Sequence, residues 1–176
     1  MSIRKIYQYP EPVLRQETRP IEQFDDELKK LVEDMAETMY DAPGIGLAAP
    51  QIGESRKLIV VDISQDREEG QEYMAMVNPE IIAHEGHQLD EEGCLSVPEL
   101  TSKVKRFKKI TVAYQDLEGN QLEVETEDRF AVVLQHEIDH LNGILFIDHL
   151  STLKRNLYKK KVKKWLADNP KAKVTA

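Results

Sequence analysis

The sequence predicts an α+β fold in which antiparallel β-sheets surround one central helix, with a further helix at the C-terminus. Segments with strand character gather in the middle of the chain, and helical periodicity precedes and follows them. Two of the strand-like segments are separated by a four-residue turn, which is typical of an antiparallel hairpin. A late helical segment carries an uninterrupted apolar run at residues 131–134, as expected of a helix that is buried on every side.

The first predicted helix covers residues 25–41. Apolar side chains recur at helical spacing from Leu28 to Met39. Asp25 or Asp26 is available as the N-cap, and acidic residues occupy the first turn. The pattern predicts an amphipathic helix with one face in the core.

Strands are predicted for residues 56–64 and 76–82, and for a hairpin formed by residues 109–116 and 121–127. The hairpin is expected to turn near Gly119 and Asn120. A second helix is predicted for residues 128–143, ending at Asn142 and Gly143.

The second helix contains the stretch QHEIDH at residues 135–140. At 3.6 residues per turn, His136 and His140 project from one face roughly 40° apart, with Glu137 at its edge. Two neutral imidazoles and an acid on a buried helix are costly to satisfy without a metal ion. The helix is therefore predicted to carry two metal ligands.

A catalytic metal site needs a third protein ligand and an open position. In zinc endopeptidases the third ligand follows the helix, but here Phe146 stands where a third histidine would, and Asp148 and His149 lie at a different offset. Upstream, the only cysteine, Cys94, lies in the turn-rich stretch EEGCLSVPE at residues 91–99. Thiolate ligation explains this cysteine better than a role as a small buried hydrophobe.

Composition and charge restrict the class of protein. A chain of 176 residues fits one domain, and no apolar run is long enough to span a bilayer. The lone cysteine and the absence of a signal-peptide pattern predict a cytoplasmic protein. Residues 1–150 hold 15 Lys and Arg against 31 Asp and Glu, whereas residues 151–176 hold nine against one. The C-terminal region is therefore a separate, basic element.

Residues 153–166 place seven basic side chains around an apolar stripe. The stripe consists of Leu153, Leu157, Val162 and Leu166. One interpretation is a solvated helix that its stripe holds against the body. The other is a helix that contacts the phosphates of RNA. Residues 168–176 are predicted to be a flexible tail.

Three stretches carry a resemblance to a known family. GIGLAAPQIG at residues 44–53, EEGCLSVP at 91–98 and QHEIDHLNG at 135–143 occur in the order and spacing of the signature motifs of peptide deformylases. The likeness is to the bacterial form and covers about residues 3–165. It implies a single catalytic domain over residues 1–167, with residues 151–167 as its basic C-terminal helix.

The resemblance implies both a reaction and the residues that perform it. The reaction is removal of the N-formyl group from the formylmethionine of new polypeptides, by attack of metal-bound hydroxide on the formyl carbon. Cys94, His136 and His140 are implied as metal ligands, and Glu137 as the general acid/base. Gln51 and the backbone N–H of Leu95 are implied to steady the formyl oxygen. The residues implied to contact substrate are Gly44, Ile45, Gly46, Leu47, Gly93, Arg129, Val132 and Val133.

The chain departs from the family pattern at the edge of the substrate site. Thr101 and Pro43 stand where an arginine and an acidic residue are frequent, and Arg129 replaces an apolar residue common in the pocket. The side-chain preference of the substrate site is therefore the least determined feature.

The resemblance also implies cofactors and partners. Iron(II) is the implied native metal, with nickel, cobalt or zinc as replacements. The implied partners are formylmethionyl peptides and, through residues 153–166, the ribosome, for a protein expected to be monomeric. Two alternatives remain open at this point: a zinc endopeptidase that uses Asp148 or His149, and a ribosome- or RNA-binding module with a structural metal.

Overall fold

The computed structural model of the chain describes residues 2–64 and 71–170. Five antiparallel strands form one sheet in the order β1-β2-β3-β4-β5. Their bounds are Gly46–Ala48 for β1, Leu58–Val61 for β2, Met74–Cys94 for β3, Val97–Gln115 for β4 and Gln121–Glu127 for β5. The three α-helices are α1 at Asp26–Asp41, α2 at Asp128–Leu141 and α3 at Thr152–Asp168. Short 3-10 helices cover Pro12–Arg15 (η1), Ala49–Ile52 (η2) and Phe146–His149 (η3).

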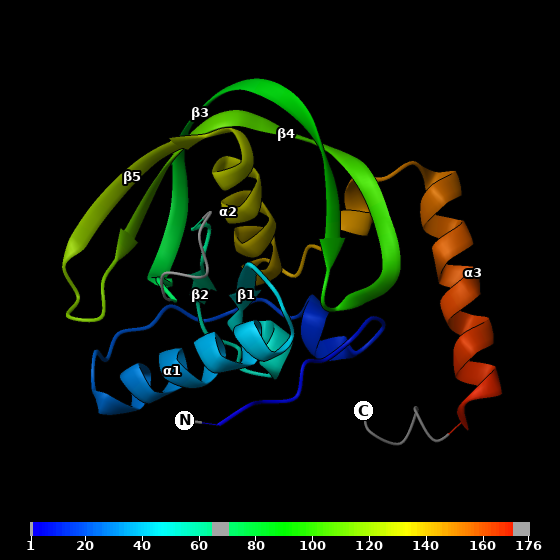
Figure 1. Cartoon of the computed structure of the whole chain (residues 1–176), viewed down its shortest axis with the longest axis horizontal. Coiled ribbons are helices and arrows are strands. Elements are labelled where there is room, and N and C mark those ends of the chain that lie inside the picture. The colour runs from blue at the N-terminus through cyan, green and yellow to red at the C-terminus, as the bar shows by residue number, and fades with distance from the viewer. Residues whose placement is uncertain (1, 65–70, 171–176) are drawn as a thin grey trace.

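The predicted fold class, the central helix and the C-terminal helix are confirmed, with the strands joined in a single sheet. The long strands β3 and β4 arch over α2, while α1 lies below, beside β1 and β2 (Figure 1). Register shifts near Glu80, Ala83 and Gly93 interrupt the β3–β4 pairing and allow these strands to bend around the helix. As a result, α2 packs against all five strands.

Local chemistry explains where the two body helices begin and end. The Asp25 side chain accepts a hydrogen bond from the Leu28 N–H at 3.0 Å and so caps α1. No side chain caps α2, but Gln135 ties it to β4 by exchanging hydrogen bonds with both backbone groups of Phe107. Gly143, at φ 71°, follows the helix in the left-handed conformation typical of a helix end.

The core separates into three groups of buried side chains, and one of them anchors α2. That group contains Ala131, Val133, Leu134 and Ile138 from α2 together with side chains of β2, β3 and β4. The predicted all-round burial of residues 131–134 is confirmed. The helix that carries the two histidines is thus held rigidly in the centre of the molecule.

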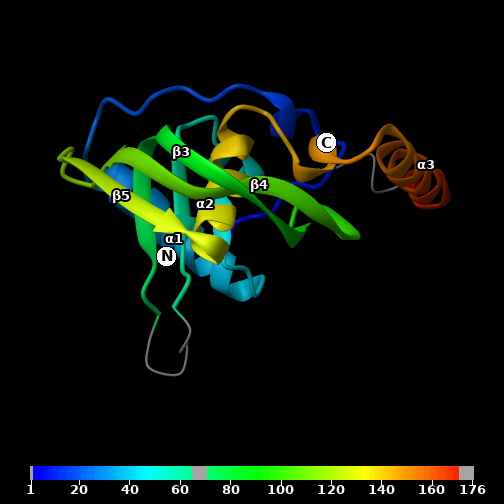
Figure 2. The same ribbon diagram turned by 90° about the horizontal axis from the view of Figure 1, so that it is seen from above.

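The C-terminal helix α3 stands apart at one end of the molecule (Figure 2). The predicted apolar stripe holds this helix only in part: Leu153 and Leu157 are 69% and 59% exposed, whereas Val162 packs against a buried group of the body. Tyr158 is its buried side chain, and the Tyr158 hydroxyl donates to the Pro98 carbonyl at 3.0 Å. The helix ends at Asp168, the first residue of the predicted tail, and residues 171–176 lie outside the described part of the chain.

Candidate metal centre and active site

Three residues predicted as metal ligands come together beneath the arch. Cys94 ends β3, and His136 and His140 lie one turn apart on the face of α2 that looks toward that strand end. One ligand atom from each residue lies within 4.8 Å of the other two, and the Cys94 Sγ is 3.4 Å from the His140 Nε2. One divalent ion can bridge atoms at this spacing.

The chemistry of these three groups fits a divalent transition-metal ion. The backbone N–H of Ser96 and the amide of Gln51 point at the Cys94 sulfur, at 3.4 and 3.7 Å, and so stabilise negative charge on it. Burial lowers the pKa of His140 well below its usual value, so this imidazole is neutral and able to bind a metal. A thiolate with two imidazoles is a donor set that suits zinc and ferrous iron.

The buried Glu92 fixes the orientation of the His136 ring. Its carboxylate lies 2.8 Å from the His136 Nδ1, which leaves the Nε2 free for a metal. Burial alone would raise the pKa of Glu92, but hydrogen bonds and charge from Arg106 and His136 outweigh it and lower the pKa to about 2. Glu92 is therefore an anion at neutral pH and a permanent acceptor for the imidazole.

Glu137 has surroundings that suit proton transfer. Its side chain is buried beside the metal-ligand group, and its Oε2 has no hydrogen-bond partner among the described residues. Burial raises the pKa of Glu137 to about 7, which is close to the value at which a carboxyl both accepts and releases protons at neutral pH.

Gly46 makes room for this carboxylate. A Cβ atom at Gly46 would lie 2.5 Å from the Glu137 Oε1, closer than any real contact allows. The resemblance implies that Gly44 and Gly46 contact substrate, and both line the cavity described below. The Glu137 carboxylate occupies the space that a side chain at Gly46 would need, and the Leu95 side chain lies 2.9 Å from the corresponding position at Gly44.

We predict that Glu137→Gln stabilises the metal-free protein at alkaline pH. Glu137 holds its proton more tightly when folded, at a pKa of about 7 against 4.5, so stability is lost as the pH rises through this window. The shift corresponds to at most about 3 kcal/mol, which neutral glutamine avoids. Urea denaturation with a chelator should show the variant to be the more stable protein at pH 8, with the difference shrinking toward pH 5. A variant no more stable than wild type at pH 8 would contradict this.

A cavity of about 500 Å³ opens beside these groups. It runs along α2, whose residues at positions 129, 132, 133, 136 and 137 all line it. Of the residues predicted for catalysis or substrate contact, those that line it are Gly44, Ile45, Gly46, Gln51, Gly93, Leu95, Arg129, Val132, Val133 and Glu137.

Leu47 is the exception, and the prediction that it contacts substrate was wrong. Successive side chains of a strand point to opposite faces. Gly46 faces Glu137, so Leu47 faces the other way, into the core beside α1, where it is fully buried.

Gln51 is held firmly in the wall of the cavity. Its Oε1 accepts from the Ala48 N–H at 2.9 Å, which fixes the amide, and its Nε2 donates to the Ser96 hydroxyl at 3.0 Å. With 2% of its surface exposed, Gln51 presents this amide in one orientation at the cavity wall.

Residues that differ from the family pattern lie at the rim of the cavity. Arg129 is 58% exposed at its side chain and pairs with Asp90 at 2.7 Å. Thr101 donates a hydrogen bond to Glu91 at 3.2 Å. The mouth of the cavity is therefore polar, while its wall at Val132 and Val133 is apolar.

The alternative ligands for a zinc endopeptidase are engaged elsewhere. Asp148 pairs with Arg15 at 2.6 Å, and His149 lies 2.9 Å from Asp139. Among residues 2–64 and 71–170, no cluster of metal-binding side chains other than Cys94, His136 and His140 is present. Asp148 and His149 are therefore not part of this metal-ligand group.

Comparison with known proteins agrees with this geometry. A family model described as polypeptide deformylase matches residues 3–156. The chain is 69% identical over 165 residues to the peptide deformylase of Desulfotalea psychrophila, covering 94% of this chain and 98% of that protein. The crystal structure of a peptide deformylase from Legionella pneumophila matches with a TM-score of 0.87 and 47% identity, over 96% of this chain and 98% of that one. The chain belongs to the polypeptide deformylase family.

Proposed function

We propose that Cys94, His136 and His140 hold the metal ion on which this hydrolase depends, and that Glu137 transfers the proton. Membership of the family makes the chain a metal-dependent amide hydrolase that removes the N-formyl group from new polypeptides. The observation that carries the residue assignment is the convergence of one sulfur and two imidazoles beside a buried, unpartnered carboxylate oxygen.

Each residue has a role that its surroundings support. A divalent ion in this site supplies a Lewis acid and lowers the pKa of a water molecule. Glu137 accepts a proton from the attacking water and returns it to the leaving amine, which its pKa near 7 favours. The amide of Gln51 and the backbone N–H of Leu95 donate to the oxyanion that develops on the formyl oxygen.

The apolar wall of the cavity suits the methionine side chain. Ile45, Val132 and Val133 line it next to the metal-ligand group, so a formyl group at the ligands leaves the adjoining side chain against them. Gly44, Gly46 and Gly93 place backbone at the cavity surface, within reach of an extended peptide. Arg129 at the rim then meets the residues that follow methionine.

The function is tested by formate release from a formyl-Met tripeptide. The metal-loaded protein should deformylate this peptide and leave internal peptide bonds of a blocked substrate intact. Cleavage of internal bonds without formate release would refute the assignment.

We further propose that the native metal is iron(II). Ferrous iron and a thiolate ligand are both lost to oxidation, so protein purified in air should be less active than protein purified anaerobically. Nickel, cobalt or zinc would be replacements, and loading the air-inactivated protein with nickel should restore turnover if the thiolate is intact. Full activity after aerobic purification, with no bound iron in the anaerobic protein, would contradict this proposal.

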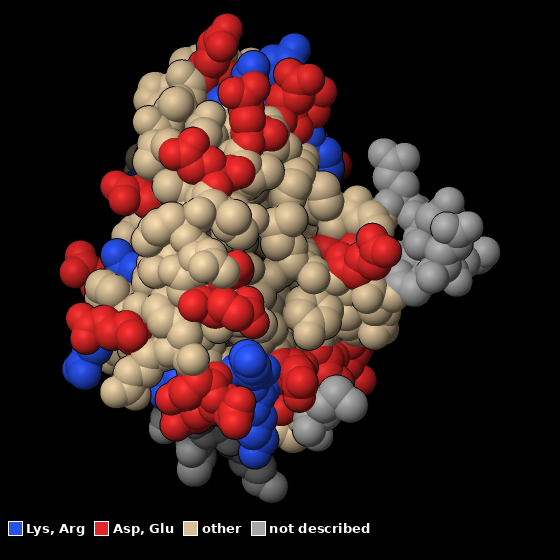
Figure 3. Space-filling view, turned by 90° about the vertical axis from the view of Figure 1, so that its left-hand side faces the viewer, with Lys and Arg blue, Asp and Glu red and all other residues tan. Residues whose placement is uncertain are grey.

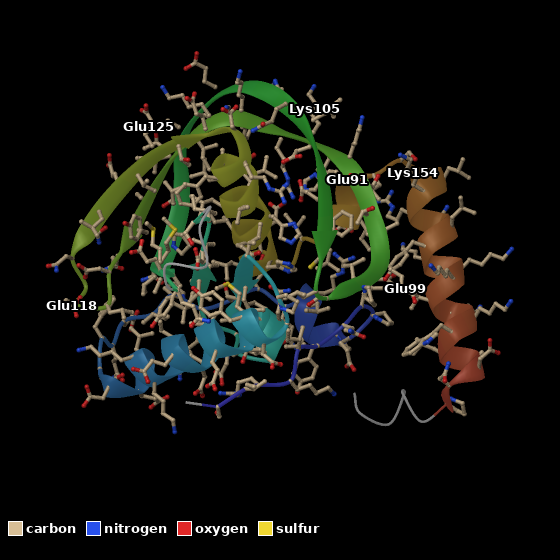
Figure 4. The ribbon with its side chains drawn as sticks, in the orientation of Figure 1. Glu91, Glu99, Lys105, Glu118, Glu125 and Lys154 are labelled. Atoms are coloured by element: carbon tan, nitrogen blue, oxygen red, sulfur yellow. The ribbon has the colours of Figure 1, made fainter. Side chains whose placement is uncertain are left out.

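We also propose that α3 contacts the ribosome. Acidic side chains outnumber basic ones on the face opposite α3, so that face would repel RNA (Figure 3). The seven basic residues at positions 153–166 lie on α3, at one end of the molecule, and this helix contacts the body through Tyr158. Glu99 projects from β4 toward this helix and pairs with Lys161 at 3.3 Å, whereas Lys154 lies near the start of the helix (Figure 4).

Reversing three exposed charges of α3 should abolish ribosome co-sedimentation at low salt. The triple variant Lys159→Glu, Lys163→Glu and Lys164→Glu leaves Tyr158 and the contact of α3 with the body in place, which truncation after Ser151 would not. The matched control reverses Lys103, Lys105 and Lys108 on β4. Both variants should hydrolyse a formylated dipeptide normally, and only the α3 variant should lose sedimentation. Equal sedimentation of the two variants would remove the proposal.

The remaining proposals concern organisation. Residues 1–167 act as one catalytic domain, since α2 packs against every strand and contacts η2. We propose that the protein works as a monomer in the cytoplasm, where new formylated chains emerge. No helix within residues 2–64 and 71–170 has the length and apolar character needed to cross a membrane.

A further inference from the structure

A buried arginine lies behind the metal-ligand group. Arg106 occupies an inward-facing position of β4, with 4% of its side chain exposed. Its Nε and Nη2 each donate to one oxygen of Glu92, both at 2.8 Å. This paired arrangement fixes the plane of the carboxylate as well as its position.

The same guanidinium also holds α2. The Arg106 Nη1 donates to the Asp139 carboxylate at 2.5 Å, and Asp139 directly precedes His140 in the helix. Glu92 lies 2.8 Å from the His136 Nδ1. Arg106 therefore contacts one residue that orients the first histidine and one residue adjacent to the second.

A fourth side chain, His149, contacts the group formed by Arg106, Glu92 and Asp139. The His149 Nε2, from η3, lies 2.9 Å from the same Asp139 oxygen that Arg106 binds. A second cavity of about 350 Å³ is lined by Arg106, Asp139 and His149. Arg106, Asp139 and His149 therefore border a surface cavity on the side of α2 away from the substrate cavity.

We propose that Arg106 is a positioning residue for the metal centre. It acts by binding the carboxylates of Glu92 and Asp139, and His149 contacts Asp139 from the surface side. This inference rests on the proposed metal ligands. With Glu92 clamped, the His136 ring is fixed with its Nε2 toward the Cys94 side, so that the ligand geometry exists before the metal arrives. Outer partners of this kind change metal affinity by about 10- to 100-fold.

An ion pair with a purely structural role would predict something different. The buried Arg106 joins β4 to α2, so its loss would lower the stability of the fold in either case. Only the positioning role predicts a change in metal affinity and in the spectrum of the bound metal in variants that remain folded. Those two readouts separate the alternatives.

The test measures cobalt(II) binding to the full-length protein by competition with a chromophoric chelator. Wild type should bind one ion and show the charge-transfer absorption of a thiolate ligand. Arg106→Gln and Glu92→Gln should each weaken binding by about 10- to 100-fold and shift the cobalt absorption bands. The double variant should lose less affinity than the two single losses combined, because both changes break the Arg106–Glu92 contact. Arg106→Lys should restore only part of the affinity, since an ammonium group cannot bind Glu92 in paired fashion.

The control variant replaces another arginine that pairs with two carboxylates but belongs to neither the metal-ligand group nor its contacts. Arg4→Gln, which loses the pairs with Asp34 and Glu54, should leave cobalt affinity unchanged. If Arg106→Gln does not fold, Asp139→Asn decides, and it should weaken binding several-fold. Wild-type affinity and spectrum in the folded variants would overturn the positioning role while the metal site stands. A wild-type protein that binds no cobalt would overturn the proposed metal ligands themselves.

Discussion

Glu137→Gln is expected to lower the kcat for formyl-Met peptides by about 10³-fold, with the metal content unchanged. General acid–base catalysis contributes about 10²- to 10⁴-fold, and Glu137 is the group that we propose performs both proton transfers. Glutamine has nearly the same shape, so the carboxylate position against Gly46 remains filled. The amide cannot accept a proton from water or return one to the amine.

Steady-state formate release and metal analysis of the same samples check this expectation. If kcat falls together with the metal content, Glu137 is acting as a ligand or as a structural group. Because the substitution should also stabilise the metal-free protein at pH 8, loss of fold is not an explanation for lost activity. A variant with bound metal and near wild-type kcat would contradict the assigned role.

Gly46→Ala is expected to lower kcat/KM by about 10²-fold through displacement of the Glu137 carboxylate. The added methyl would lie 2.5 Å from the Glu137 Oε1 and 2.9 Å from its carboxyl carbon. The backbone at Gly46 is paired with Val61 of β2, so the glutamate side chain must move instead. A displacement of about 1 Å in a catalytic group costs roughly this factor.

The control for this prediction is the double variant Gly46→Ala with Glu137→Gln. If the methyl acts through Glu137, adding it to a protein that already lacks the carboxylate should cost little further activity. Fully additive losses would mean that Gly46 serves the substrate directly, as the sequence had suggested. Unchanged activity in the single variant would show that the glutamate tolerates the shift.

The sequence predicted the core elements because their burial leaves a pattern. Apolar periodicity marked α1 and α2, and the hairpin between β4 and β5 followed from its turn, in which Gly119 has φ 85°. The full extent of β3 was missed, since it runs from Met74 to Cys94 and not over residues 76–82 alone. Most of its outer half is exposed, so no alternation of apolar residues marks it, and pairing with β4 holds it in place.

The candidate site was predicted in part, for a related reason. Two histidines one turn apart can be seen within a single helix, whereas Cys94 reaches them only through the folding of β3 and β4. Glu92 and Arg106 were missed altogether. The alternation of buried residues at Ser102, Val104 and Arg106 places a charged side chain in an inward position, which is the signal that could have predicted a buried partner.

The most direct test of the metal centre is X-ray absorption spectroscopy of the metal in anaerobically purified protein. The proposed ligands predict one sulfur and two imidazole nitrogens around the ion, with the remaining coordination from a light atom such as a water oxygen. Cys94→Ser should remove the sulfur signal. A spectrum without sulfur, or one in which four protein side chains fill the coordination sphere, would contradict the assignment of Cys94, His136 and His140 as an open hydrolytic site.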